Sequence, residues 1–186
     1  MDIDVYTFCF CEKERNMSAD ISVILNKKIN ISALLIGTKA ELKKILCSTE
    51  DIDLSIWRLN KGKREEILLE EIKDAENCYL LGPRGYYDAV GLVFIGALET
   101  NELEMGISVG SIKTPIEYAI AAAIAIYIAK EQNTNVIDDG CVWSSEYEQT
   151  PDEFENQLIL KENYESIQIA AEVFYRNMYM NSGKRI

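Results

Sequence analysis

The cysteines and carboxylates carry the chemistry open to this chain, because the sequence contains no histidine. Histidine is the commonest general base and a common zinc ligand. Its absence excludes the usual catalytic triads and every metal site that needs an imidazole. Catalysis by cysteine, lysine or carboxylate groups stays open on these grounds.

Cys9 and Cys11 form the one closely spaced thiol pair among five cysteines. In a strand, residues i and i+2 face the same side, so both thiolates could reach one metal ion. A structural zinc site takes four ligands, however, and the sequence has no second CxC or CxxC. We therefore interpret both residues as buried core thiols and expect neither a metal site nor a cofactor.

The loop sequence "GPRGYYDAVG" (82–91) is glycine-rich and contains Arg84, which raises the question of phosphate binding. It matches neither the dinucleotide fingerprint nor the P-loop spacing. We predict a turn, with a surface patch of Arg84, Tyr86, Tyr87 and Asp88 as the alternative.

An acidic segment at 138–155, "DDGCVWSSEYEQTPDEFE", holds seven acids and no base, with aromatic residues between them. Aromatic anchors ringed by charge give a protein interface affinity and fast, steered association. The alternative is a solvated loop followed by a helix N-terminus, where acids offset the helix dipole. Asp152 and Glu153 fit that alternative. The predicted partner-binding residues are the remaining ones: Asp138, Asp139, Trp143, Glu146, Tyr147 and Glu148.

The net charge of −12, from 31 acids and 19 bases, restricts the partners. Nucleic acids and anionic membranes are themselves polyanions, so we expect neither as a direct partner. A basic protein suits the charge, and solubility alone is the other explanation. The acidic start "MDIDVYTFCFCEKER" lacks the basic leader of a signal peptide, and scattered cysteines indicate reduced thiols. We expect a cytoplasmic protein.

The first 113 residues read mainly as strands. Apolar runs predict strands at 3–10, 20–26, 29–37, 53–60 and 78–82, with a strand or helix after the turn near 60–63, and a β-hairpin over 89–112 turning near 100–102. Thr38 and Glu41 have the spacing of a capping box, which predicts a short helix near 39–47.

The longest apolar stretch, "KTPIEYAIAAAIAIYIAKE" (113–131), predicts a buried helix over about 115–132. Thr114, Pro115 and Glu117 form a start signal of capping box plus proline. Isoleucines recur every four residues along one side and alanines cover the other. The uninterrupted apolar part is too short for a membrane span, which needs about 20 residues. We therefore assign the helix to the core.

A further box at Thr150–Glu153 predicts another helix start, and an apolar stripe continues to Met178. Phe154 and Leu158 are out of phase with that stripe. The phase shift predicts a break near 160–163 and therefore two C-terminal helices.

One resemblance adds to these patterns. The helix "IEYAIAAAIAIYIAKEQ", the short strand "NVID" and the tryptophan of "GCVWS" resemble small acidic immunity proteins of contact-dependent inhibition and polymorphic toxin systems, over roughly residues 90–145. The resemblance implies a non-enzymatic protein that binds a cognate toxin domain and blocks it. It supplies no motif from which binding residues could be mapped.

We therefore predict a single α+β domain over 1–186. Residues 1–113 would be mostly β with a short helix near 39–47, and 114–186 mostly α with a short strand near 135–143. The expected function is immunity against a basic, nuclease-type toxin domain. A regulatory or adaptor module and a histidine-independent enzyme are the alternatives, and the sequence leaves the oligomeric state open.

Overall fold

The computed structural model describes residues 20–60, 63–67, 71–72, 79–85, 89–96, 103–109 and 113–181. The strand expected at 3–10 lies outside these ranges, with Cys9 and Cys11. The hairpin turn near 100–102 lies outside them too, as do Tyr86, Tyr87 and Asp88.

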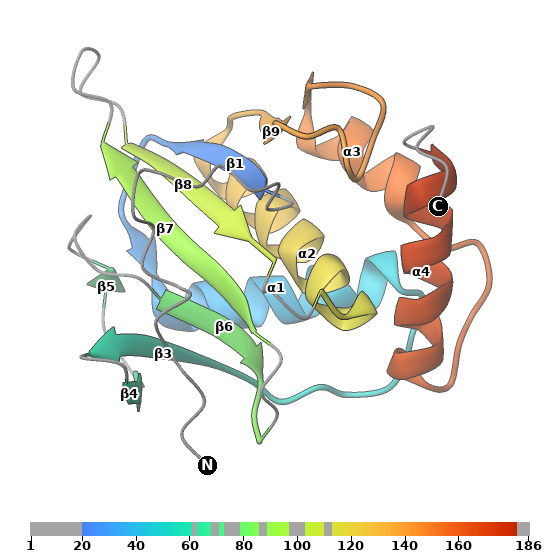
Figure 1. Ribbon diagram of the computed structural model, residues 1–186, viewed down its shortest axis with the longest axis horizontal. Coiled ribbons are helices and arrows are strands. Elements are labelled where there is room, and N and C mark those ends of the chain that lie inside the picture. The colour runs from blue at the N-terminus through green and yellow to red at the C-terminus, as the bar shows by residue number, and fades with distance from the viewer. Residues whose placement is uncertain are drawn as a thin grey trace.

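An antiparallel sheet of eight strands forms one layer of the fold, in the order β10-β9-β1-β8-β7-β6-β3-β4 (Figure 1). The strands are β1 (Asp20–Leu25), β3 (Leu54–Asn60), β4 (Lys63–Glu66), β6 (Tyr79–Pro83), β7 (Val90–Gly96), β8 (Leu103–Ser108), β9 (Val136–Asp138) and β10 (Glu148–Gln149). Two short strands, β2 (Ile29–Asn30) and β5 (Glu71–Ile72), pair separately. Together with the helices, this sheet confirms the predicted α+β class.

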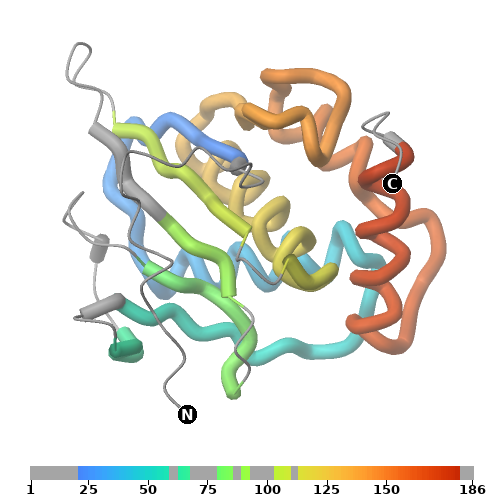
Figure 2. Tube along the Cα trace, viewed as in Figure 1, coloured from blue at the N-terminus to red at the C-terminus, as the bar shows by residue number. Residues whose placement is uncertain are grey.

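Strand β1 lies inside the sheet although it comes first among the described strands. Ile21 is opposite Ile107 of β8 on one side and opposite Asp138 of β9 on the other. Figure 2 shows this early segment, in blue, between the later strands. Ile21, Val23 and Leu25 alternate along β1 and are buried, as expected for a strand with one face on the core.

Four helices complete the described structure: α1 (Ile31–Ile45), α2 (Pro115–Gln132), α3 (Pro151–Leu158) and α4 (Ile167–Asn181). Helices α1 and α2 lie against the same face of the sheet (Figure 1). Helix α2 also contacts α3 and α4, so it lies between the sheet and α4.

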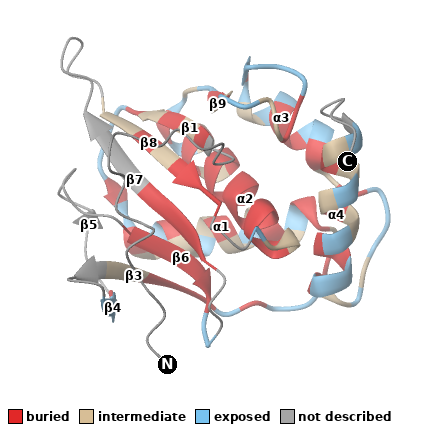
Figure 3. Ribbon diagram, viewed as in Figure 1, coloured by how far each residue is buried: buried red, intermediate tan, exposed pale blue. Residues whose placement is uncertain are grey.

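Helix α2 has the predicted bounds and is buried along nearly its whole length (Figure 3). The Glu117 carboxylate accepts the backbone N–H of Thr114 at 3.0 Å and that of Ala89, beside β7, at 3.2 Å, which fixes the helix start. Its alanines let the neighbouring layers approach closely. None of the helices in the described ranges has the length and apolarity needed to span a bilayer.

Helix α1 corrects the prediction of a strand over residues 29–37, and its second half matches the short helix predicted near 39–47. The expected strand ends at Asn30, whose side chain accepts the N–H of Ala33 at 3.0 Å and caps a helix that starts at Ile31. Thr38 is fully buried in the middle of this helix, so the capping box assigned to it does not form. The buried positions of α1, at 31, 34, 38, 42 and 45, have helical spacing.

The break between the C-terminal helices is confirmed, although it is longer than predicted. Helix α3 ends at Leu158 and α4 starts at Ile167. The connection is fastened to the end of α1, because Leu160 N donates to Ile45 O at 2.8 Å and Tyr164 N to Cys47 O at 3.0 Å.

Candidate partner-binding surface

The predicted binding residues lie at the edge of the sheet, where the chain leaves β9 and returns as β10. The connecting loop runs from Asp139 to Tyr147. The N–H of Asp138 donates to the carbonyl of Tyr147 at 2.8 Å, so both ends of the loop are held together. A loop closed in this way can present its outer side chains in a defined arrangement.

The Asp138 carboxylate organises this loop from inside. It accepts three backbone N–H groups, from Val142 at 2.9 Å, Trp143 at 2.8 Å and Ser144 at 2.9 Å. The residue is 1% exposed. A buried carboxylate that accepts several N–H groups takes the place of the secondary structure that the loop lacks.

Trp143 attaches the loop to α2. Its indole is fully buried, and Nε1 donates to the carbonyl of Tyr118 at 3.1 Å. The Tyr118 ring lies 5.5 Å from the Trp143 ring and 5.0 Å from that of Tyr175 in α4, so the loop, α2 and α4 share one aromatic cluster.

These positions correct the prediction for Asp138 and Trp143. Both side chains are inside the protein, where they cannot contact a partner, and their role in the described structure is to shape the loop. The prediction treated all six selected residues as outward-facing, and for these two it was wrong.

The other four predicted residues, Asp139, Glu146, Tyr147 and Glu148, are exposed. Tyr147 is 54% exposed, which is unusual among the aromatic side chains that the structure describes. The negative charge of Asp139 raises the pKa of the Tyr147 phenol above its ordinary value, helped by partial desolvation, a hydrogen bond to Asp139, and the charges of Glu104 and Glu148. The phenol therefore lies in the field of several carboxylates.

Glu104 belongs to this group although the sequence analysis did not select it. It lies on β8, opposite Ile24 of β1, and reaches the group across the sheet. Its signal in the sequence was an acid within an otherwise apolar strand. We refer to Glu104, Asp139, Glu146, Tyr147 and Glu148 as the Tyr147 surface.

Two of the remaining acids of the segment have local structural roles. Glu153 accepts the N–H of Thr150 at 3.1 Å while the Thr150 hydroxyl accepts the N–H of Glu153 at 3.3 Å, which completes the predicted capping box of α3. Glu155 is buried and forms ion pairs with Lys130 of α2 and Lys44 of α1. This carboxylate joins three helices.

The described side chains of the Tyr147 surface are four carboxylates and one phenol. Within the described ranges, no three Cys, Asp or Glu side chains are placed to hold a metal ion. Arg84, from the glycine-rich loop, is paired with Asp53 at 3.2 Å and Glu66 at 2.7 Å and fastens β6 to β3 and β4. What the Tyr147 surface offers chemically is an aromatic ring surrounded by negative charge.

Comparison with known proteins gives no relative for this chain: no family model, no curated protein and no solved structure matches it.

Proposed function

We propose that this protein is an immunity protein, which binds a basic toxin domain through the Tyr147 surface and blocks it without catalysis. The observation that carries the proposal is the exposed phenol of Tyr147 among the carboxylates of Asp139, Glu104 and Glu148.

The charge of the surface determines the class of partner. Lysine and arginine side chains complement a cluster of carboxylates, and long-range attraction accelerates their encounter. A nuclease-type toxin carries such basic residues because its own substrate is a polyanion. An acidic inhibitor can therefore occupy the substrate-binding region by matching the charge of the nucleic acid.

The ring of Tyr147 supplies binding affinity that exposed charges alone do not provide. Exposed charge pairs contribute little affinity, whereas an aromatic anchor that becomes buried can contribute about 2 kcal/mol or more. An arginine guanidinium stacks well on an aromatic face and also pairs with a neighbouring carboxylate. Tyr147 and Asp139 together offer both contacts.

The rigid support of the loop favours fast binding. Asp138 and Trp143 hold the loop in place before any partner arrives. A preformed surface avoids the entropic cost of ordering a loop on binding.

The test is capture of the partner from a lysate of the source cell, at low and high salt, with identification by mass spectrometry. The proposal expects a basic domain of a large secreted protein, retained in stoichiometric amount and weakened by salt. The captured domain is then purified and its association rate measured against variants.

Two triple variants separate the Tyr147 surface from net charge. One changes Asp139→Asn, Glu146→Gln and Glu148→Gln, and the other changes the exposed acids Glu131, Glu162 and Glu165 to Gln. Both remove three negative charges. Only the first is expected to slow association, by about tenfold, and to flatten its salt dependence.

Tyr147→Ala tests the anchor directly and is expected to weaken binding by roughly 30-fold, mainly through faster dissociation. Equal effects of the two triple variants would move the interface away from this surface. A captured partner of ordinary charge, held independently of salt, would support the adaptor alternative instead.

A further inference from the structure

A second surface lies on α4, on the side opposite the helix's buried face. Ile169 is 58% and Met180 is 71% exposed, and Arg176 lies between them, also exposed. At about 100° per residue these three residues fall on one line along the helix, with half-buried Val173 beside it. Glu172 borders the same line.

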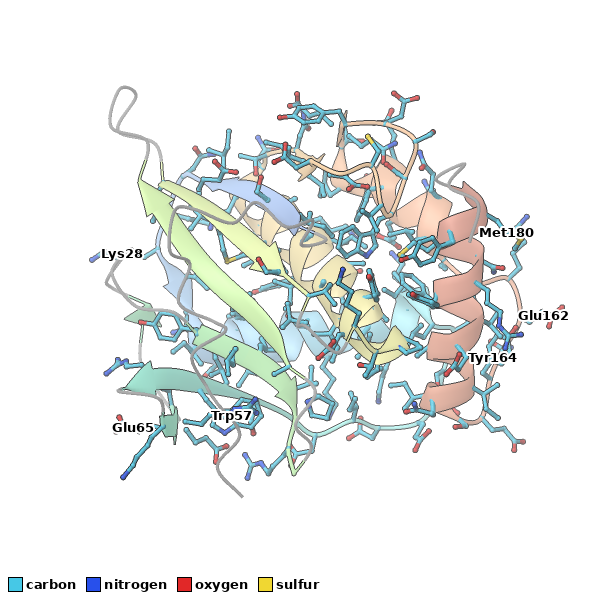
Figure 4. All side chains as sticks on the ribbon, in the orientation of Figure 1. Lys28, Trp57, Glu65, Glu162, Tyr164 and Met180 are labelled. Atoms are coloured by element: carbon cyan, nitrogen blue, oxygen red, sulfur yellow. The ribbon has the colours of Figure 1, made fainter. Side chains whose placement is uncertain are left out.

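The buried residues of α4 occupy the other side of the helix. Ala170, Ala171, Phe174 and Met178 are at most 1% exposed and face the core. Figure 4 shows Met180 on the side of α4 that points away from the sheet. The line of Ile169, Val173, Arg176 and Met180, with Glu172, is called the α4 stripe below.

The α4 stripe is complementary to itself when a second copy is placed antiparallel to it. Ile169 and Met180 lie equally far from the midpoint between Phe174 and Tyr175, on opposite sides of it. A two-fold axis through that midpoint therefore brings Ile169 of one copy to Met180 of the other, and Val173 to Arg176. This is the self-complementary pattern of a two-fold symmetric interface.

The charges of the stripe fit the same arrangement. Glu172 precedes the midpoint and Arg176 follows it. In the antiparallel pair, the glutamate of one copy therefore lies opposite position 177 of the other, one residue or about 1.5 Å of helix rise from Arg176. A parallel pairing would place like charges opposite one another. The stripe carries one acid and one base in a chain of net charge −12, so like-charge repulsion between copies is weak here.

We propose that two copies of this protein associate through antiparallel α4 helices, with Ile169 packed on Met180 and Glu172 paired with Arg176 across a two-fold axis. The site is separate from the Tyr147 surface, and either proposal can fail without the other. One face of a 15-residue helix buries less area than a standard interface, so dimerisation is weak, with a dissociation constant on the order of 0.1 mM.

Sedimentation equilibrium of the purified full chain, from low concentration up to about 1 mM, measures this association. The wild-type chain is expected to dimerise reversibly. Ile169→Glu and Met180→Glu each place a carboxylate against an apolar side chain of the second copy and are each expected to abolish dimerisation. Ile36→Glu is the matched control, because Ile36 on α1 is also 71% exposed and should leave dimerisation unchanged.

A charge exchange tests the antiparallel pairing itself. Glu172→Arg and Arg176→Glu are each expected to abolish self-association, because like charges then face each other. The double variant in one chain restores the pair and dimerises again. A mixture of the two single variants forms a heterodimer, in which both cross-axis pairs are complementary.

Thermal melts of every variant check that the monomer is folded. A wild-type chain that stays monomeric at 1 mM would overturn the proposal. So would single charge variants that dimerise like the wild type, or Ile36→Glu acting like Met180→Glu.

Discussion

The Oδ2 atom of Asp138 lies 2.8 Å from the backbone nitrogen of Trp143 and accepts its N–H. This contact joins the last residue of β9 to the residue that anchors the loop on α2. The exposed side chains of the loop after β9 are thus positioned by two buried residues, Asp138 and Trp143.

Asp138→Asn is expected to destabilise the protein by about 2–3 kcal/mol, because an amide keeps one acceptor oxygen where the carboxylate uses two and brings an unmatched donor. Urea denaturation measures the change. Asp139→Asn is the adjacent control: its side chain is exposed, so its effect should stay within about 0.5 kcal/mol. Equal effects would show that Asp138 does not organise the loop.

Gly37→Ala tests the contact between α1 and α2. A Cβ at Gly37 would lie 2.0 Å from the ring of Tyr127, so the ring must leave its place. In most helices this change stabilises by roughly 0.5–1 kcal/mol. Here we expect destabilisation of about 1–2 kcal/mol.

A double-mutant cycle with Tyr127→Ala isolates that clash. With the ring removed, Gly37→Ala should become neutral or stabilising in the same denaturation experiment. Destabilisation of equal size in both backgrounds would assign the effect to something other than Tyr127.

Glu155 predicts a pH dependence of stability. Burial alone would raise the pKa of Glu155, but hydrogen bonds from Lys130 and Lys44 outweigh it and lower the pKa below its ordinary value. A carboxyl with a lowered folded-state pKa stabilises the protein above its unfolded-state pKa, near 4.3. That contribution is lost as the pH falls through the folded-state pKa.

Glu155→Gln should therefore cost about 3 kcal/mol at neutral pH and progressively less below about pH 4, where the wild-type carboxyl becomes protonated. Denaturation curves from pH 7 to pH 3 measure the difference between the two proteins. Glu131→Gln, in an exposed pair with Lys27, should show a small difference at every pH. If the difference in unfolding free energy between the wild type and Glu155→Gln grew as the pH fell, the ion-pair explanation would be contradicted.

The Tyr147 surface predicts a titration. The pKa of the Tyr147 phenol is raised chiefly by the charge of Asp139, so Asp139→Asn should lower it toward the ordinary value. Added salt should also lower the pKa of Tyr147, because it screens exposed charges. Ultraviolet difference titration against Tyr147→Phe isolates this phenol from the other tyrosines. If Asp139→Asn left the pKa of Tyr147 unchanged, the charge of Asp139 would not act on the Tyr147 phenol.

The sequence predicted α2 and α3 well because local signals agreed there. Each has threonine before proline and a glutamate at the capping position, and the length of α2 followed from its apolar stretch. The first half of helix α1 was missed because its residues, "ISALLIG", resemble a strand in composition while their spacing is helical. Thr38 and Glu41 have the residue types and spacing of a capping box, but they lie in the middle of α1 and not at its start.

The acidic segment shows a second kind of feature that the sequence alone does not predict, the direction of each side chain. Residue types establish how much charge the segment carries, but the direction of each side chain depends on the fold. Asp138 points inward because it lies on the same face of β9 as buried Val136, two residues earlier. Glu104 joins the Tyr147 surface only through the pairing of β8 with β1, which spacing along the chain does not reveal.

The position of β1 inside the sheet also determines when this strand can find its neighbours during synthesis, because both neighbours come later in the chain. Ile21 cannot pair with Asp138 until the ribosome has added 117 more residues, since 138 less 21 is 117. At about 5–20 residues per second, that takes roughly 6–23 s. Throughout this interval β1 lacks its β9 partner, and for most of it the apolar side chains of Ile21, Val23 and Leu25 also lack the α2 helix that later packs against them. The newborn protein is thus most open to chaperones, and to mispairing with other chains, at its earliest described strand.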